Sequence, residues 1–264
     1  MEGRAAAPAA GTVLNALANG YGSAFAIDAH TEATVELDGS GEVTGEVAGA
    51  PEANTRLVER CVERVTARFG DGEGGHVRTE SEVPMAAGLK SSSAAANAAV
   101  LATLSALSVE DIDREDACRI GVEAARDAGV TVTDNTEDEL LRRDAPEWDV
   151  LVYTPDERAL SADADVSRCE RVAPVADVAR ELALDGAYRQ AMCVNAFAFC
   201  AALEYPTDPV LEAMPEAAAS LSGTGPSYTA VGERGTLADL ADAWEQREGH
   251  TWLTTTRTDG ATTR

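Results

Sequence analysis

The chain is poor in lysine and in aromatic residues, and it has no long apolar run. Lys90 is its single lysine, against twenty arginines, and aromatic side chains make up 5% of the 264 residues. No apolar stretch approaches the roughly 20 residues that a membrane-spanning helix needs, and the N-terminus does not resemble a signal peptide. We therefore expect a cytoplasmic protein with no membrane partner.

Residues suited to metal or disulfide chemistry are also few. The three histidines are isolated, and the odd number of cysteines includes no C-x-x-C pair. These spacings argue against a zinc site and against a disulfide framework. We expect reduced and mostly buried thiols at all five cysteine positions: Cys61, Cys118, Cys169, Cys193 and Cys200.

Acidic residues dominate the charge. The sequence has 46 aspartates and glutamates against 21 basic residues, a net charge of −25, and the acids are spread along the chain. High ionic strength screens such self-repulsion, so the composition indicates a salt-accumulating cytoplasm. The negative surface argues against nucleic-acid binding. A hydrophobic content of 45% in a chain of this length is ample for a buried core.

A loop of small residues runs directly into an alanine-rich helix that begins near Ser91. Ser91, Ser92 and Ser93 are suitable helix caps, and Gly88 permits a positive φ. The partial positive charge of a helix N-terminus suits a phosphate group, and Lys90 adds a full charge there. No Walker A motif is present. By composition alone, an ordinary capped helix after a turn explains this segment equally well.

A second glycine-rich segment lies near the C-terminus. Two short strands are expected within residues 217–232, and they flank a turn that contains Gly223 and Gly225. Glycines at these positions would let backbone N–H groups form an anion-binding nest. Without other information, a tight hairpin is the simpler interpretation.

Periodicity and turn residues predict the remaining elements. We expect two short strands within Gly3–Leu17 joined by a turn at Pro8–Gly11, and two antiparallel strands within Tyr21–Leu37. A hairpin turn at Asp38–Gly41 should lead into a strand at Glu42–Val47. Further strands are expected at 76–83, 130–133, 148–153 and 251–257, and helices at 54–69, 114–128, 137–143, 176–202 (broken near Gly186), 209–214 and 237–247. A break near Pro146 predicts two domains, 1–145 and 146–264.

The two glycine segments resemble motifs of the GHMP kinases. Pro84, Gly88, Leu89, Ser91, Ser92 and Ala94 match the family's Pro-x-x-x-Gly-Leu-x-Ser-Ser-x-Ala phosphate loop, and Ser222–Ser227 is similar to its Ser-Gly-Thr-Gly-Pro-Ser motif. The opening Ala-Pro-Ala-Ala-Gly-Thr-Val-Leu-Asn segment resembles the archaeal shikimate kinases in particular. The resemblance covers nearly the whole chain, and two motifs in the right order are more specific than either one.

This resemblance implies a fold and an activity. The fold would be a two-layer α/β (α+β) arrangement, with an N-terminal domain like domain 2 of ribosomal protein S5 and a ferredoxin-like C-terminal domain. ATP, with Mg²⁺, would bind between them and phosphorylate the 3-hydroxyl of shikimate, a small-molecule substrate. Homoserine kinase is the alternative enzyme, and an ATP-binding pseudokinase without turnover is the alternative of another class.

The resemblance also implies roles for particular residues. Substrate contacts would come from Thr12, Asn15, Gly223, Thr224 and Gly225, and Lys90 is a candidate catalytic group. As single residues, Thr12 and Asn15 are equally well explained as turn groups with satisfied hydrogen bonds. A hydroxyl of Ser91, Ser92 or Ser93 would bind Mg²⁺, with Ser92 as our candidate. The nucleotide would be bound by the whole loop: Pro84, Met85, Ala86, Ala87, Gly88, Leu89, Lys90, Ser91, Ser92, Ser93, Ala94 and Ala95.

One part of the family pattern is missing. In the archaeal shikimate kinases, a strand like Gly129–Thr133 is followed by a segment that carries the usual candidate for the catalytic acid. Here the strand runs straight into Asp134 and Asn135. We predict that this segment has been deleted between Thr133 and Asp134, which leaves nucleotide binding at reduced affinity and little or no kinase activity. The alternative is that Asp134 is itself the catalytic acid.

Overall fold

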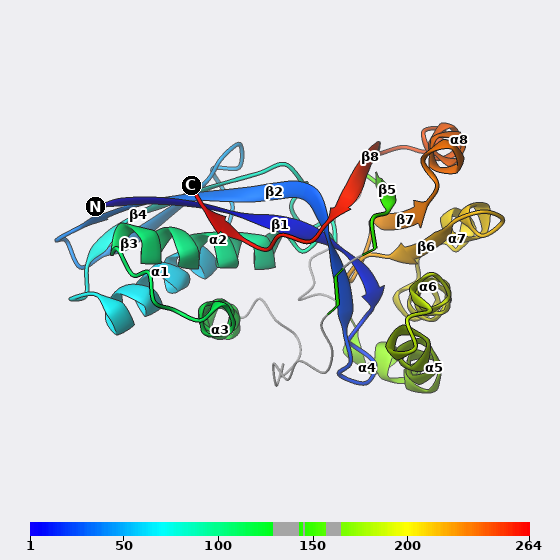
Figure 1. Cartoon of the computed structure of the whole chain (residues 1–264), viewed down its shortest axis with the longest axis horizontal. Coiled ribbons are helices and arrows are strands. Elements are labelled where there is room, and N and C mark those ends of the chain that lie inside the picture. The colour runs from blue at the N-terminus through cyan, green and yellow to red at the C-terminus, as the bar shows by residue number, and fades with distance from the viewer. Residues whose placement is uncertain (129–142, 145, 157–164) are drawn as a thin grey trace.

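The computed structural model describes residues 1–128, 143–144, 146–156 and 165–264. This part of the chain forms two lobes that share one sheet (Figure 1). The strand order is β3-β4-β2-β8-β5-β7-β6, with β1 paired to β2 and β9 paired to β1. The strands are β1 (Glu2–Leu14), β2 (Ser23–Asp38), β3 (Val43–Val47), β4 (Gly74–Ser81), β5 (Asp149–Thr154), β6 (Ala218–Leu221), β7 (Tyr228–Gly232), β8 (His250–Arg257) and β9 (Thr262–Thr263).

The N-terminal lobe packs three helices on one face of β1–β4 (Figure 1). These are α1 (Arg56–Phe69), α2 (Ser91–Ala106) and α3 (Arg114–Asp127). All three agree with the predicted helices, and Asp113 caps α3 as expected by accepting a hydrogen bond from the backbone N–H of Glu115. Alanine and valine fill the core between helices and sheet, so the long α2 lies close against β1 and β2.

Three strand predictions in this lobe are wrong. β1 is one continuous strand, because its pairing with β2 continues past Pro8 with a register shift between Pro8 and Ala10. A proline, which lacks an N–H, is tolerated at such an irregularity in a sheet. β2 is also a single strand, of 16 residues. Asp38–Gly41 does not close a hairpin, because β3 pairs with β4 in parallel and β4 lies between β3 and β2. A parallel pair needs a crossover, and α1 supplies it.

The C-terminal lobe has a ferredoxin-like topology. Its four strands occur in the sheet in the order β8-β5-β7-β6, and each is antiparallel to its neighbours. The helices between β5 and β6 are α4 (Val166–Glu170), α5 (Ala173–Leu184), α6 (Tyr188–Leu203) and α7 (Asp208–Ala213), and α8 (Arg234–Trp244) connects β7 to β8. The expected break near Gly186 separates α5 from α6. The predicted fold class is therefore confirmed.

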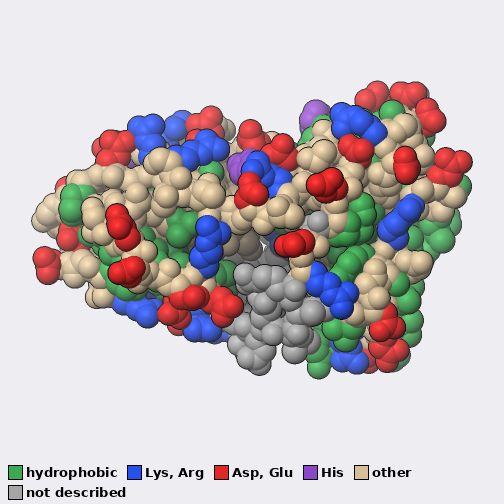
Figure 2. Space-filling model, viewed as in Figure 1, with side chains coloured by type: hydrophobic (Ala, Val, Ile, Leu, Met, Phe, Trp, Pro, Cys, Tyr) green, Lys and Arg blue, Asp and Glu red, His purple; other side chains and the backbone are tan. Residues whose placement is uncertain are grey.

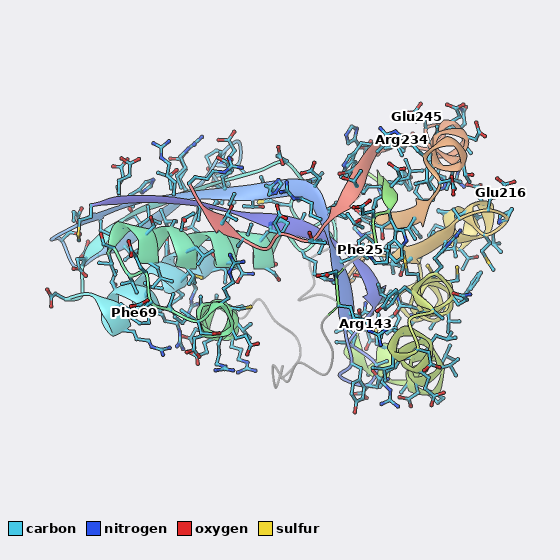
Figure 3. The ribbon with its side chains drawn as sticks, in the orientation of Figure 1. Phe25, Phe69, Arg143, Glu216, Arg234 and Glu245 are labelled. Carbon is cyan, nitrogen blue, oxygen red and sulfur yellow. The ribbon has the colours of Figure 1, made fainter. Side chains whose placement is uncertain are left out.

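A third core cluster joins the two lobes. β8 pairs with β2 as well as with β5, and the end of β1 packs against α5, α6 and β6. Phe25 of β2 contacts Trp148 edge-on at this junction, where Figure 3 shows it between the lobes. Arg143 lies beside the α5–α6 turn and donates to the carbonyl of Leu184. The division at residue 145 stays a prediction, but β1 contributes to both lobes.

Several expectations concern the surface and the thiols. Among the described residues, no helix is long and apolar enough to cross a membrane. All five cysteines are free thiols, and Cys61, Cys169 and Cys200 are buried. Charged side chains are spread over both lobes of the visible face, as the scattered acids of the sequence predict (Figure 2). The strand expected at 130–133 lies outside the described residues, as does nearly all of the helix expected at 137–143.

Candidate functional site

The predicted phosphate loop lies at the junction between the lobes and is anchored by two buried side chains. Ala87 and Leu89 are buried in the core cluster that joins the lobes. The carbonyl of Leu89 also accepts a hydrogen bond from the backbone N–H of Ala10. Ala86, Gly88 and Lys90 have positive φ, so alternate residues adopt the left-handed region. The loop is therefore held in one shape by its buried residues, while its half-exposed residues remain at the surface.

The first turn of α2 follows this loop, and it differs from the prediction in how it begins. The capping position is Lys90, with φ 62°, and its side chain makes no capping hydrogen bond. The expected serine caps are wrong, because Ser91, Ser92 and Ser93 are the first three residues inside the helix. Their backbone N–H groups have no acceptor within the helix and are available to a ligand. Ser92 and Ser93 are exposed, and α2 contains no charged residue.

The turn between β6 and β7 packs directly on the phosphate loop. Ser222 donates its hydroxyl hydrogen to the carbonyl of Gly88 at 3.0 Å, and the backbone N–H of Ser227 donates to the carbonyl of Ala87 at 3.3 Å. The contact is so close that a Cβ on Gly88 would lie 2.1 Å from the Ser222 carbonyl oxygen. The two glycine segments, in which Gly88 and Ser222 lie 134 residues apart in the sequence, therefore pack against each other.

Thr12, near the end of β1, connects both glycine segments. Its Oγ1 accepts one hydrogen bond from Lys90 Nζ at 3.1 Å and another from the backbone N–H of Gly223 at 2.9 Å. Asn15 adds a bond from its Nδ2 to the carbonyl of Gly223 at 2.6 Å. The structure thus brings together Thr12, Asn15, Lys90 and Gly223 from three distant parts of the sequence. Thr12 is fully buried and Asn15 nearly so, whereas Gly223 is half-buried.

Lys90 is partly buried, and burial lowers the pKa of its side chain from the usual 10.5 to about 8. The neighbouring segments supply no carboxylate, because residues 10–15, 83–89, 91–106 and 222–227 contain no acidic side chain. A cation in this position favours the approach of an anionic ligand group.

Sequence reasoning missed Asn195, a buried residue of α6. Its Oδ1 accepts from the backbone N–H of Asn15 at 2.8 Å, and its Nδ2 donates to Ser220 Oγ at 3.0 Å. The signal was an asparagine in an otherwise apolar stretch of helix, where a buried amide requires partners. Thr224 is half-buried beside Gly223, and Asp134 lies outside the described residues.

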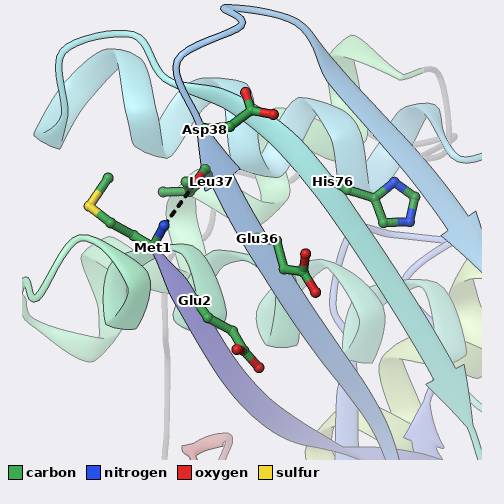
Figure 4. Close-up of a pocket in the computed structure, with 6 residues that line it drawn as sticks. All are labelled: Met1, Glu2, Glu36, Leu37, Asp38 and His76. Carbon is green, nitrogen blue, oxygen red and sulfur yellow. Dashed lines mark hydrogen bonds between the residues drawn. The ribbon is translucent and has the colours of Figure 1, made fainter.

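A shallow pocket lies elsewhere, at the start of β1 and the end of β2 (Figure 4). Glu2, Glu36, Asp38 and His76 surround it, and the N-terminal amine of Met1 donates to the carbonyl of Leu37 nearby. Since Thr12 lies at the opposite end of β1, this acidic pocket is not part of the phosphate loop. Its negative charge is also unsuited to a nucleotide.

Comparison with known proteins agrees with this geometry. Residues 56–136 match the GHMP kinases N terminal domain family. A shikimate kinase of Halobacterium salinarum is 59% identical, with all of both chains covered. The chain belongs to the shikimate kinase family of the GHMP kinases. A shikimate kinase of Methanosarcina mazei is 44% identical over 99% of this chain and 96% of that protein.

The solved structures support the fold of the family. A homoserine kinase from Cytophaga hutchinsonii superposes with a TM-score of 0.74 over 100% of this chain and 97% of that one, at 14% sequence identity. At this identity the likeness shows the shared fold and does not decide between acceptor substrates.

The alignment with the Halobacterium relative also contains positions that have no residue in this chain. The alignment with the Halobacterium protein has 283 positions and covers all of both chains, whereas this chain has 264 residues. At least 19 aligned positions, the difference between 283 and 264, therefore have no residue here. These positions agree with the predicted deletion, while their forming a single segment and its place between Thr133 and Asp134 stay predictions.

Proposed function

We propose that this chain binds ATP at the loop Pro84–Ala95 and transfers its γ-phosphoryl group to the 3-hydroxyl of shikimate. The observation that carries the proposal is the packing of the two family motifs against each other, in a chain that aligns with a shikimate kinase over its full length. The N–H groups of residues 91–93 would bind phosphate oxygens, and Lys90 would add a positive charge.

The reaction forms a bond between the substrate oxygen and the γ-phosphorus. The bond between that phosphorus and the β–γ bridging oxygen breaks, ADP leaves, and the hydroxyl proton passes to a base. Such transfers depend mainly on positioning and on neutralising charge. Mg²⁺, when bound, would neutralise phosphate charge, and the exposed hydroxyl of Ser92 at the start of α2 fits a role as one of its ligands. The rigid loop would fix the phosphates relative to the acceptor.

The missing positions predict a slow enzyme. If they include the general base, the rate falls about 10²- to 10⁴-fold while nucleotide binding persists. Binding with little turnover is then the behaviour of this particular chain. Asp134 is the alternative base, since it follows the place where we expect the deletion.

A coupled assay of ADP formation in molar KCl tests the proposal. The assay compares shikimate with homoserine, and mass spectrometry identifies the phosphorylated product. We expect phosphorylated shikimate only, at a rate at least about 10²-fold below that of a chain with the family segment restored after Thr133. Turnover of homoserine alone would identify the alternative kinase.

Three further outcomes are decisive. Calorimetry that detects no ATP binding in high salt would contradict the nucleotide site itself. ATP binding with no turnover, together with turnover by the restored chain, would identify this chain as a pseudokinase. Equal rates in both chains, with activity lost in Asp134→Asn, would show that Asp134 is the catalytic base.

A further inference from the structure

The hydroxyl of Thr12 has an unusual set of partners. It accepts from Lys90 Nζ and from the Gly223 N–H, so both lone pairs of Oγ1 are used by donors. The side chain is fully buried, which leaves no surface for direct contact with a substrate. These contacts fix the hydroxyl as an acceptor toward the ammonium group, and such a bond stabilises the charged form of lysine.

Neighbouring residues hold Thr12 and Gly223 in place. Asn15 donates to the carbonyl of Gly223, and Asn195 accepts from the backbone N–H of Asn15. Gly223 is thus bonded through both its N–H and its carbonyl to the end of β1. A buried network with satisfied partners rigidifies a site and specifies one geometry.

We propose that Thr12 is a positioning residue for Lys90, holding its ammonium group beside the N-terminus of α2, where it meets a phosphate of the bound nucleotide. The proposal rests on the proposed function for its ligand. It assigns Thr12 a different role from the substrate contact that the sequence predicted. Lys90 touches the ligand, and Thr12 acts through Lys90.

The segments around the Lys90 ammonium group supply no other charged side chain. Residues 10–15, the loop 83–89, helix α2 and the turn 222–227 contribute hydroxyl, amide and apolar groups but no charged side chain besides Lys90. Burial alone lowers the pKa of Lys90 to about 8. Removing the Thr12 acceptor should therefore lower this pKa further, because no neighbouring carboxylate of these segments compensates.

The single lysine makes the test direct. Protein grown with lysine labelled with ¹³C at the ε carbon gives one side-chain resonance, whose pH titration reports the pKa of Lys90 without any ligand. We expect a midpoint near 8 in the wild type, one about 1 unit or more lower in Thr12→Val, and recovery in Thr12→Ser. Thr103→Val is the matched control, because it removes a buried hydroxyl from α2 that lies about 20 Å along the helix from Lys90.

Calorimetry with MgATP at pH 7.5 then measures whether the position of the Lys90 ammonium group affects nucleotide affinity. We expect Thr12→Val to weaken binding about 3- to 10-fold, Lys90→Met to weaken it at least as much, and the double variant to be no weaker than Lys90→Met. An unchanged Lys90 titration in Thr12→Val, or additive losses in the double variant, would overturn the proposal. Absence of ATP binding to the wild type would instead contradict the proposed function, while the titration would still report on Thr12.

Discussion

Lys90→Met should make the folded protein more stable at neutral pH. The folded pKa of about 8 lies below the unfolded value of 10.5, so burial disfavours the charged form. A difference of about 2.5 pKa units corresponds to at most about 3 kcal/mol, and contact of Lys90 with solvent reduces this figure. Methionine keeps an unbranched apolar stem at the same backbone position, and Thr12 retains the Gly223 N–H as a partner. We expect a gain of about 1–3 kcal/mol at pH 7.

The sign of the effect follows from proton linkage. Below pH 8 lysine is charged in both states and the full penalty of burial is present. Between pH 8 and 10.5 the unfolded chain binds more protons, so the stability of the wild type rises with pH. The advantage of Lys90→Met should therefore shrink by about 2 kcal/mol between pH 7 and pH 9.5.

Urea unfolding of both proteins at the two pH values, at one fixed KCl concentration, measures this difference. Other titrating groups are common to both chains and cancel in the comparison. Lys90→Arg is the control. Because arginine stays charged at both pH values, the difference in unfolding free energy between Lys90→Arg and Lys90→Met should not change with pH. A difference in unfolding free energy that does not change with pH, or a less stable Lys90→Met at both values, would refute the reasoning. We expect the same variant to bind nucleotide less well, so that Lys90 would serve the proposed function at a cost in stability.

Two further predictions concern the loop and the surface. Gly88→Ala should destabilise the protein by about 1–3 kcal/mol and weaken ATP binding, because its Cβ would meet the Ser222 carbonyl and φ at this position is +79°. Gly20→Ala is the control, because φ there is +81° but no atom lies within 4 Å of the added Cβ. Unfolding experiments on both variants therefore separate the effect of backbone strain from that of the contact with Ser222. Equal losses in the two variants would show that the packing of the loops is not the cause. The net charge of −25 predicts that the thermal unfolding midpoint rises steeply between dilute buffer and about 2–4 M KCl, where the Debye length falls below about 3 Å. A midpoint that does not depend on salt would contradict this interpretation of the composition.

Local features of the sequence determined most of the individual elements. The periodicity of α1 and α3, the Asp113 cap, the break between α5 and α6, and the position of the phosphate loop before α2 all follow from neighbouring residues. These signals are local because helix periodicity, capping and turn chemistry act over a few residues. The two glycine motifs likewise predict the place of the proposed phosphate site.

Only the tertiary structure decided which of these elements meet. Pro8 suggested a turn, but pairing with β2 keeps β1 in one strand that reaches the second lobe. β3 pairs with β4 rather than with β2, which precedes it directly in the sequence. Thr12 contacts Lys90 across 78 residues and Gly223 across 211, and no local pattern specifies contacts of such separation. They arise because burying the junction between the lobes forces the end of β1, the phosphate loop and the β6–β7 turn together, where their buried polar groups must find partners.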